Sequence, residues 1–208
     1  MIHQSDTQAP LRLRRLLRQD MDEAVALYAE LSRDGAWADG VTLCALLRCG
    51  ALWGGFCGGT MVICGGLCPS DAPVAVAQAA RATGLISARA MLLLPAAGSA
   101  AQMQLFTEAL LKNAACRDAQ PVALVPVKTG AEFAAGCFAA GLVLCGVRPL
   151  VSLRPHYLFA ARIGVQTDAK NSTMIALQDT YALSRLLEQG FCGVALRDNE
   201  VRMEKLKA

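Results

Sequence analysis

Charged side chains are scarce in this sequence of 208 residues, at 18%, and aromatic side chains are scarcer still, at 5%. Hydrophobic residues make up 54%, which excludes an intrinsically disordered chain, because such chains lack the apolar side chains needed for a core. The net charge is only +3 and acids interleave with the arginines, so no nucleic-acid-binding surface is indicated. The length fits one domain, or one domain with an appendage.

Metal-binding patterns are also missing. The nine cysteines include no C-x-x-C pair, and the two histidines, His3 and His156, are too few for finger-type zinc spacings. The cysteines lie almost entirely in apolar stretches, which predicts buried, reduced thiols and no metal. Reduced thiols in this number imply a reducing compartment, and we expect a cytoplasmic protein. The N-terminus is polar, which predicts that no signal peptide is present.

One stretch without charge is long enough to be considered as a membrane span. Residues 49–68 contain no charged side chain over 20 positions. Glycine occupies seven of these positions, and each glycine weakens a helix by about 1 kcal/mol relative to alanine. Two strands over 51–57 and 60–67, joined by a turn at Gly58-Gly59, fit the pattern better. We therefore expect a hairpin and no membrane association.

The remaining chain alternates between short apolar runs and segments with helical periodicity. This order predicts an α/β fold with mixed strand pairing. Segment 69–84 is rich in alanine and is compatible with either a loop or a short helix. Strands are expected at 11–16, 85–94, 122–127, 142–147 and 157–163, and helices at 20–35, 41–48, 103–114 and 129–141.

A second unit is predicted after a polar break at 166–173. It contains a strand at 174–177, a helix that begins at Asp179 and ends at Gly190, and two strands around Asp198-Asn199. A capped helix with an apolar face would have no use in a disordered tail. We expect a domain over 1–165 and a C-terminal βαββ extension over 166–208 that packs on it.

Four segments, in this order, resemble the GNAT superfamily of N-acetyltransferases over residues 11–163. They are LRLRRLLRQDMDEAVALYAEL, LWGGFCGGTMVICGGL, ARAMLLLP with the small-residue turn after it, and FAAGCFAAGLVLCGVRP. The resemblance implies a central mixed, mostly antiparallel sheet flanked by helices. It also implies an N-acyltransferase that moves an acetyl group from acetyl-CoA to a primary amine of a small molecule or peptide. A homodimer is an open alternative to a monomer.

The resemblance further implies where acetyl-CoA would bind. A strand that separates from its neighbour before Pro95 would offer its backbone to the pantetheine arm and polarise the thioester carbonyl. The helix after it would direct N–H groups at the pyrophosphate. The turn departs from the family pattern, since it carries no Arg. The residues implied in cofactor binding are Leu92, Leu93, Leu94, Gly98, Ser99, Ala100, Ala101 and Gln102.

The family's general acid is a Tyr near the end of the fourth helix, and Cys137 or Phe138 stands in its place here. Among the remaining candidates, Tyr157 is favoured as the acid and His156 suits base chemistry near neutral pH. The competing interpretation of Tyr157 is a side chain that only packs in the sheet. Because the Arg and the Tyr are missing, a non-catalytic GNAT-like binding domain with a decayed acyl-CoA site is the alternative function.

Overall fold

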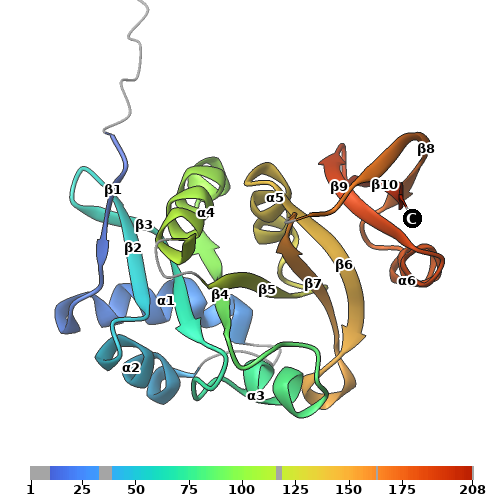
Figure 1. The fold of residues 1–208 in the computed structure, drawn as a ribbon. Helices are drawn as coiled ribbons and strands as arrows, with labels where there is room; N and C mark the ends of the chain where they lie inside the picture. Colours follow the sequence, from blue (N-terminus) through green and yellow to red (C-terminus); the bar gives the residue numbers. More distant parts are fainter. Residues whose placement is uncertain (1–9, 33–38, 116–118, 163, 208) are drawn as a thin grey trace, which may run out of the picture.

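The computed structural model describes residues 10–32, 39–115, 119–162 and 164–207. Within these ranges, ten strands form one sheet in the order β1-β2-β3-β4-β5-β7-β6-β9-β10-β8 (Figure 1). Only β4 and β5 pair in parallel, so the predicted mixed, mostly antiparallel sheet flanked by helices is confirmed.

The elements alternate along the chain broadly as the sequence predicts. The helices are α1 (Met21–Ser32), α2 (Gly40–Arg48), α3 (Ala75–Ala82), α4 (Ala100–Ala115), α5 (Ala131–Ala139) and α6 (Thr180–Glu188), with short 3-10 turns η1 (Arg18–Asp20) and η2 (Val151–Leu153). The strands are β1 (Arg12–Arg15), β2 (Leu52–Cys57), β3 (Thr60–Pro69), β4 (Ala90–Gly98), β5 (Gln120–Pro126), β6 (Leu142–Pro149), β7 (Pro155–Ala161), β8 (Thr167–Ala176), β9 (Phe191–Arg197) and β10 (Glu200–Leu206).

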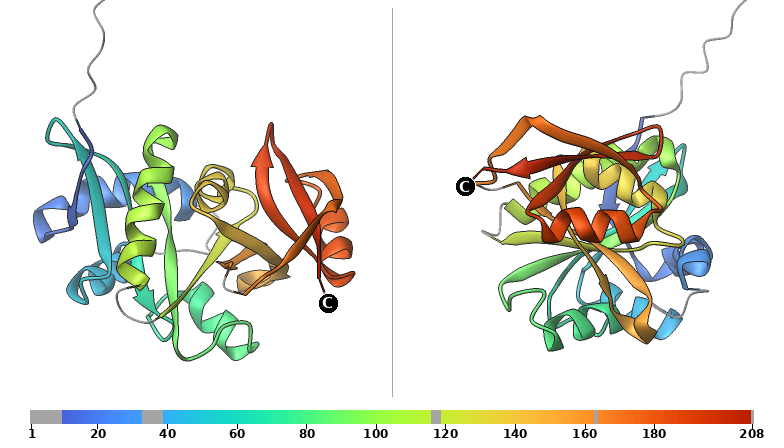
Figure 2. Two further views of the ribbon diagram at one scale, coloured as in Figure 1. Left: turned by 45° about the horizontal axis from the view of Figure 1, so that its top comes forward. Right: turned by 90° about the vertical axis from the view of Figure 1, so that its right-hand side faces the viewer.

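The sheet separates two hydrophobic cores. One core joins α1, α2 and α3 to one face, and the other joins α4 and α5 to the opposite face (Figure 2). Each strand in the middle of the sheet therefore buries side chains on both faces, which explains why β3, β4 and β5 are almost continuously apolar.

The hairpin of β2 and β3 confirms the preference for strands over a membrane helix. Cys57 lies opposite Thr60, and the turn residues Gly58 and Gly59 have φ values of 59° and 93°, where a side chain is disfavoured. No helix in the described part of the chain is long and apolar enough to cross a bilayer. Segment 69–84 contains a short helix, α3, and the predicted helix end at Gly35 lies outside the described residues.

The predicted strand over 85–94 is wrong in its bounds, because β4 begins at Ala90 and continues across Pro95 to Gly98. Leu85 instead closes the end of α3, where its N–H donates to the carbonyl of Ala80 at 2.9 Å. The register of β4 with β3 shifts around Pro95, giving β4 one extra residue and hence a bulge. Proline has no N–H to donate, and a bulge is where a strand can accommodate it.

The C-terminal extension consists of β8, α6, β9 and β10, and it continues the sheet beyond β6 (Figure 2). Leu144 of β6 pairs with Gly193 of β9, and the Tyr157 hydroxyl donates to the carbonyl of Leu177 at 2.6 Å. The predicted polar break at 166–173 is wrong, since β8 begins at Thr167 and pairs with β10. Its polar sequence reflects an edge strand with exposed side chains rather than a linker.

Candidate active site

The two parallel strands at the centre of the sheet separate before they end. Their register pairs run from Ala90 with Gln120 to Leu93 with Ala123, whereas β4 continues to Gly98 and β5 to Pro126. On its other side β4 remains paired with β3 as far as Gly98. The backbone of β4 from Leu94 onward therefore has one edge without a strand partner.

This position corrects the predicted acyl-binding strand. Leu92 and Leu93 pair with β3 on one side and with β5 on the other, so their backbone is committed to the sheet. Of the three predicted residues, only Leu94 lies in the separated part. The open edge of β4 consists of residues 94–98. The parallel pairing of β4 with β5 includes Leu92 and Leu93, which the sequence predicted to be free for the cofactor.

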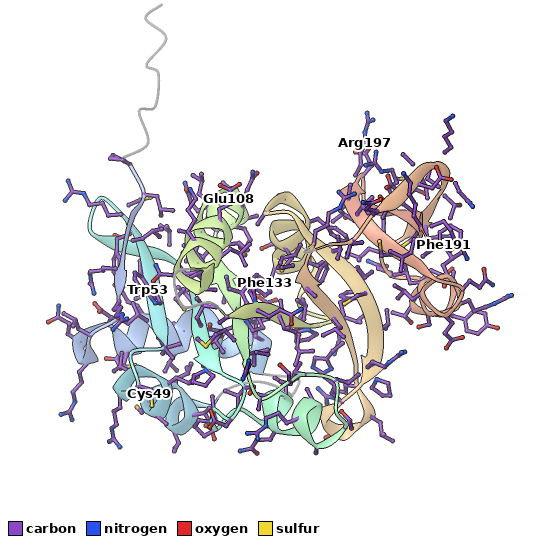
Figure 3. The ribbon with its side chains drawn as sticks, viewed as in Figure 1. Cys49, Trp53, Glu108, Phe133, Phe191 and Arg197 are labelled. Atoms are coloured by element: carbon purple, nitrogen blue, oxygen red, sulfur yellow. The ribbon has the colours of Figure 1, made fainter. Side chains whose placement is uncertain are left out.

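A pocket of about 260 Å³ lies where the strands separate. The end of β4 forms its middle, α1 contributes from one face of the sheet, and the start of α5 contributes from the other. Phe133, labelled near the middle of Figure 3, is one of the residues that line this pocket. The lining residues are Ala26, Leu27, Glu30, Leu31, Ala96, Ala97, Gly98, Thr129, Glu132 and Phe133.

Three of these lining residues carry polar side chains. Glu30 of α1 and Glu132 in the first turn of α5 are exposed carboxylates on opposite faces of the sheet. The Oγ1 atom of Thr129 is buried and has no hydrogen-bond partner among the described residues. A buried hydroxyl without a partner is costly, so a ligand that accepts its hydrogen bond would be favoured. The pocket thus offers two negative charges and one hydroxyl donor on an apolar wall.

The predicted pyrophosphate turn lies beside this pocket and is partly committed to the fold. Gly98 has φ of 128°, and a Cβ there would collide with the carbonyl oxygen of Val62. The N–H of Ser99 donates to that carbonyl at 2.7 Å, and the N–H of Gln102 donates to the carbonyl of Ser99 at 3.1 Å. Among the five predicted residues, the first-turn N–H groups of Ala100 and Ala101 are the ones a helix leaves unsatisfied.

Helices α4 and α5 lie side by side and both begin at this edge of the sheet (Figure 1). They approach closely at Gly136, where a Cβ would come within 2.5 Å of Cγ of Met103. Each helix directs the positive end of its dipole toward the separated strands. The start of α4 is therefore electrostatically suited to an anionic group, whereas Glu132 places a negative charge in the first turn of α5.

Two of the predicted catalytic residues lie away from the pocket lining. Cys137 is fully buried inside the α4 and α5 core, and burial raises the pKa of its thiol. Tyr157 is 1% exposed, and its hydroxyl donates a hydrogen bond to the carbonyl of Leu177. Burial raises the pKa of Tyr157 to about 12. The structure gives Cys137 a packing role and Tyr157 a link to the extension, and it brings neither to the open edge of β4.

His156 lies near the start of β7, beside the end of β5. It stands opposite Pro126 at the end of β5 and opposite Arg148 of β6, and it is completely buried. Its Nδ1 is 3.0 Å from the carbonyl oxygen of Arg154. Because neighbouring residues of a strand face opposite sides, His156 and Tyr157 lie on different faces of the sheet. The pocket lining does not include His156.

Sequence reasoning missed Glu30, Thr129 and Glu132. A signal existed for the latter two, since they flank the start of α5, and the carboxyl ends of parallel strands meet at one edge of a sheet. Glu30 is one of several exposed acids on α1, and nothing in its spacing distinguishes it. Among the described residues, no group of three or more His, Cys, Asp or Glu side chains could hold a metal ion.

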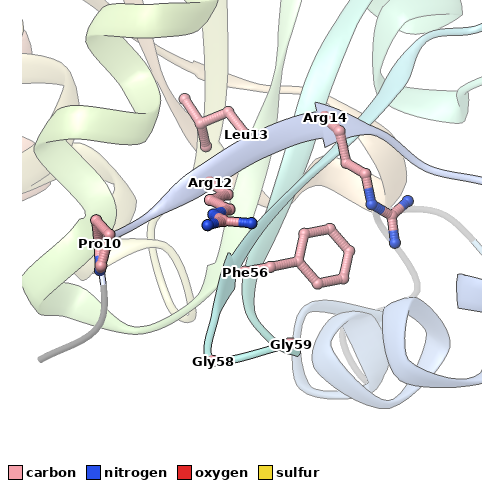
Figure 4. A pocket seen from close by; sticks show the side chains of 7 residues that line it. All are labelled: Pro10, Arg12, Leu13, Arg14, Phe56, Gly58 and Gly59. Carbon is pink, nitrogen blue, oxygen red and sulfur yellow. The ribbon is translucent and has the colours of Figure 1, made fainter.

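A larger pocket, of about 610 Å³, lies at the outer edge of the sheet (Figure 4). It is lined by β1 and the β2–β3 turn, with Arg12, Arg14 and Phe56 on its walls. Arg14 is already engaged, because it forms two hydrogen bonds with Asp20 and stacks 4.0 Å above the Phe56 ring. This pocket is separated from β4 by β2 and β3, so we place the candidate active site at the separated strands instead.

No protein-family model matches the sequence, and no curated protein matches it. Solved structures are similar in fold. A GNAT-family acetyltransferase from Streptococcus agalactiae 2603 is 13% identical, with a TM-score of 0.52 over 74% of this chain and 96% of that chain. An N-acyl amino acid synthase from uncultured soil microbes is 15% identical, with a TM-score of 0.54 over 75% and 91%. An N-acetyltransferase from Staphylococcus aureus Mu50 is 9% identical, with a TM-score of 0.53 over 74% and 97%.

These identities are low, so the likeness concerns the fold. The chain shares with these structures an α/β architecture of one mixed sheet flanked by helices. The chain has the GNAT fold, and the resemblance predicted from the sequence is confirmed at that level.

Proposed function

We propose that this protein is an N-acyltransferase that moves an acetyl group from acetyl-CoA to a primary amine of a small molecule or peptide. The observation that carries this proposal is the pocket lined by α1, the end of β4 and the start of α5, beyond the point where the pairing of β4 with β5 stops at Leu93 and Ala123. Unpaired strand backbone, two helix N-termini and a buried hydroxyl without a partner converge at this place.

In this proposal the cofactor enters from the side of α4 and α5. Its pyrophosphate accepts hydrogen bonds from the N–H groups of Ala100 and Ala101, where the dipole of α4 favours negative charge. Its pantetheine arm pairs with the open edge of β4, as an added strand would. The thioester then lies in the pocket between 94–98 of β4 and the start of α5.

The acceptor amine enters from the side of α1. Glu30 and Glu132 are the lining groups that can attract an ammonium ion and take its proton. The neutral amine then forms the C–N bond at the thioester carbonyl, the C–S bond breaks, and the proton that the nitrogen loses ends on the departing thiolate. Among the lining residues that the structure describes, Thr129 is the one with a hydroxyl that can donate a hydrogen bond, so we assign it to the departing sulfur or the carbonyl oxygen.

The alternative is a binding domain that holds an acyl-CoA without transferring the acyl group. The burial of Cys137 and Phe138 favours it, because both residues that could stand in the place of the family's Tyr lie in the core. Both functions require acetyl-CoA binding, and only the first requires a product.

The experiment pairs calorimetric titration of acetyl-CoA with mass detection of acetylated amines from a panel. Mass detection is needed because the protein's own thiols react with reagents that measure released CoA. The enzyme proposal predicts binding and one or more acetylated products. Binding without any product over the whole panel supports the alternative, and absence of binding contradicts both.

A further inference from the structure

Two cysteines lie opposite each other where the extension joins the domain. The junction pairs Leu144 of β6 with Gly193 of β9 in antiparallel orientation. In an antiparallel pair, the residue after one partner lies opposite the residue before the other. Cys145 is therefore the cross-strand neighbour of Cys192.

Their side chains leave the sheet on the same face. Leu144 is completely buried, and a Cβ added to Gly193 would lie 3.0 Å from Cβ of Leu144, so both of these positions point into the core of α4 and α5. Cys192 precedes Gly193 along β9, and Cys145 is exposed where Leu144 is buried, so both cysteines point to the other face. Cys145 is also the extra residue of a bulge toward β7, and its thiol donates to the carbonyl of Leu158 at 3.3 Å.

The two thiols differ in access. The sequence predicts buried cysteines throughout, but Cys145 is exposed, whereas Cys192 is 3% exposed. Both are free thiols. Cα atoms of opposing residues in an antiparallel pair are roughly 4.5–5.5 Å apart, within the range of about 4.4–6.8 Å that a disulfide spans.

We propose that Cys145 and Cys192 form a disulfide that fastens the C-terminal extension to the domain when the protein meets a small disulfide such as oxidised glutathione. The thiolate of Cys145 attacks the small disulfide, forms a mixed disulfide and releases one small thiol. The thiolate of Cys192 then attacks the Cys145 sulfur, and the second small thiol departs. Two protein thiols lose two electrons, the small disulfide gains them, and the two thiol protons pass to the released thiols.

The chemistry is slow at neutral pH. Although Cys145 is exposed as a whole residue, burial around its sulfur raises the pKa of its thiol to about 11. Little thiolate is therefore present, and an alkaline buffer is needed to complete the exchange. Once formed, the link would add a covalent tie to a junction held by the Leu144–Gly193 pair and the Tyr157–Leu177 hydrogen bond. Separation of the extension from β6 would then require reduction.

The test uses the full chain, incubated with oxidised glutathione in alkaline buffer and digested with trypsin without reduction. The peptide of residues 129–162 should appear joined to the peptide of residues 186–197, because trypsin does not cleave the Arg148–Pro149 and Arg154–Pro155 bonds, and reduction should separate them. Because the first peptide also contains Cys137, the decisive variant is Cys145→Ser, in which the joined species should vanish.

Two further variants complete the design. Cys192→Ser should leave Cys145 as a stable mixed disulfide with glutathione, since no second thiol resolves it. Cys44→Ser, at another exposed cysteine, should leave the joined peptides unchanged. The proposal is overturned if wild-type protein shows no joined species at equilibrium, or if the joined species persists in Cys145→Ser.

Discussion

Leu93 and Ala123 form the last register pair between β4 and β5, and beyond them the two strands continue without pairing to each other. The α1 side and the α5 side of the sheet therefore meet through one opening, lined by Glu30 and Glu132. The start of α4 beside this opening favours an anion, and the two carboxylates that line the opening favour an ammonium ion. The proposed reaction needs both.

The first prediction concerns the turn before α4. In the double variant Ser99→Asp with Ala100→Asp, two carboxylates would stand where the pyrophosphate is expected. Repulsion between such charges costs between about 1 and 4 kcal/mol for each close pair, so acetyl-CoA should bind at least about 100-fold more weakly. Calorimetric titration measures the effect. Leu105→Asp, at a half-exposed position further along the same helix, is the matched control and should bind as the wild type does.

The second prediction concerns the two pocket carboxylates. Glu30→Gln and Glu132→Gln keep the shape of the side chain and remove its charge. The variant that loses the proton acceptor should lower kcat by about 10² to 10⁴, and the other should chiefly raise KM for the amine. Steady-state kinetics on any amine found to be a substrate separates the two effects. Glu188→Gln on exposed α6 serves as the control; full activity in both pocket variants would remove the carboxylates from the mechanism.

The third prediction concerns Tyr157. Replacement by Phe removes the hydroxyl that donates to Leu177 and leaves a buried carbonyl without this partner, so unfolding should require about 1 to 3 kcal/mol less free energy. Denaturant unfolding measures this loss. Tyr181→Phe is the control, because Tyr181 is 73% exposed. We expect kcat to change little; a loss of about 10² or more would instead restore Tyr157 as the general acid.

The fourth prediction concerns the pH dependence of stability. The hydrogen bonds from Arg14 lower the pKa of Asp20 below its ordinary value of 3.8, and the backbone N–H of Leu17 acts in the same direction. A carboxyl whose pKa is lower in the folded state stabilises the fold at any pH above its unfolded-state pKa. This stabilisation is lost as the pH falls through its folded-state pKa. Asp20→Asn should therefore cost about 1 to 2 kcal/mol near neutral pH, with water screening the half-exposed Arg14.

Urea unfolding of Asp20→Asn and wild type, repeated from neutral pH to below pH 3.8, checks this expectation. The difference in unfolding free energy should stay constant above that value and shrink below it. Asp22→Asn, at an exposed neighbouring acid, should show no such trend. A difference that grew with acidity would contradict the assigned ion pair.

Local signals in the sequence predicted much of the fold. Gly58-Gly59 marks a hairpin because both residues adopt positive φ, and Asp179 begins α6 because its carboxylate accepts the N–H of Ala182. The end of β4 could not be predicted in this way. Its bulge at Pro95 depends on how β3 pairs with it, which is a contact between distant segments.

The site was harder to predict for the same reason. The hydroxyl of Tyr157 is occupied by a hydrogen bond to the carbonyl of Leu177. Leu177 belongs to the C-terminal extension, which adds new strands to the sheet. Glu30 and Glu132 are about a hundred positions apart, and only the separation of β4 from β5 brings them to one opening. Neither relationship leaves a pattern in the local sequence.

The most direct test of the central claim is a titration of isotope-labelled protein with acetyl-CoA, followed through the backbone amide resonances. The account predicts that the largest shifts fall on 96–101, at the end of β4 and the start of α4, and on 129–133, at the start of α5. Amides of β1 and of the β2–β3 turn should stay unchanged. Absence of shifts at saturating acetyl-CoA, or shifts confined to the pocket around Arg12 and Phe56, would contradict the placement of the acyl-CoA site between the separated strands.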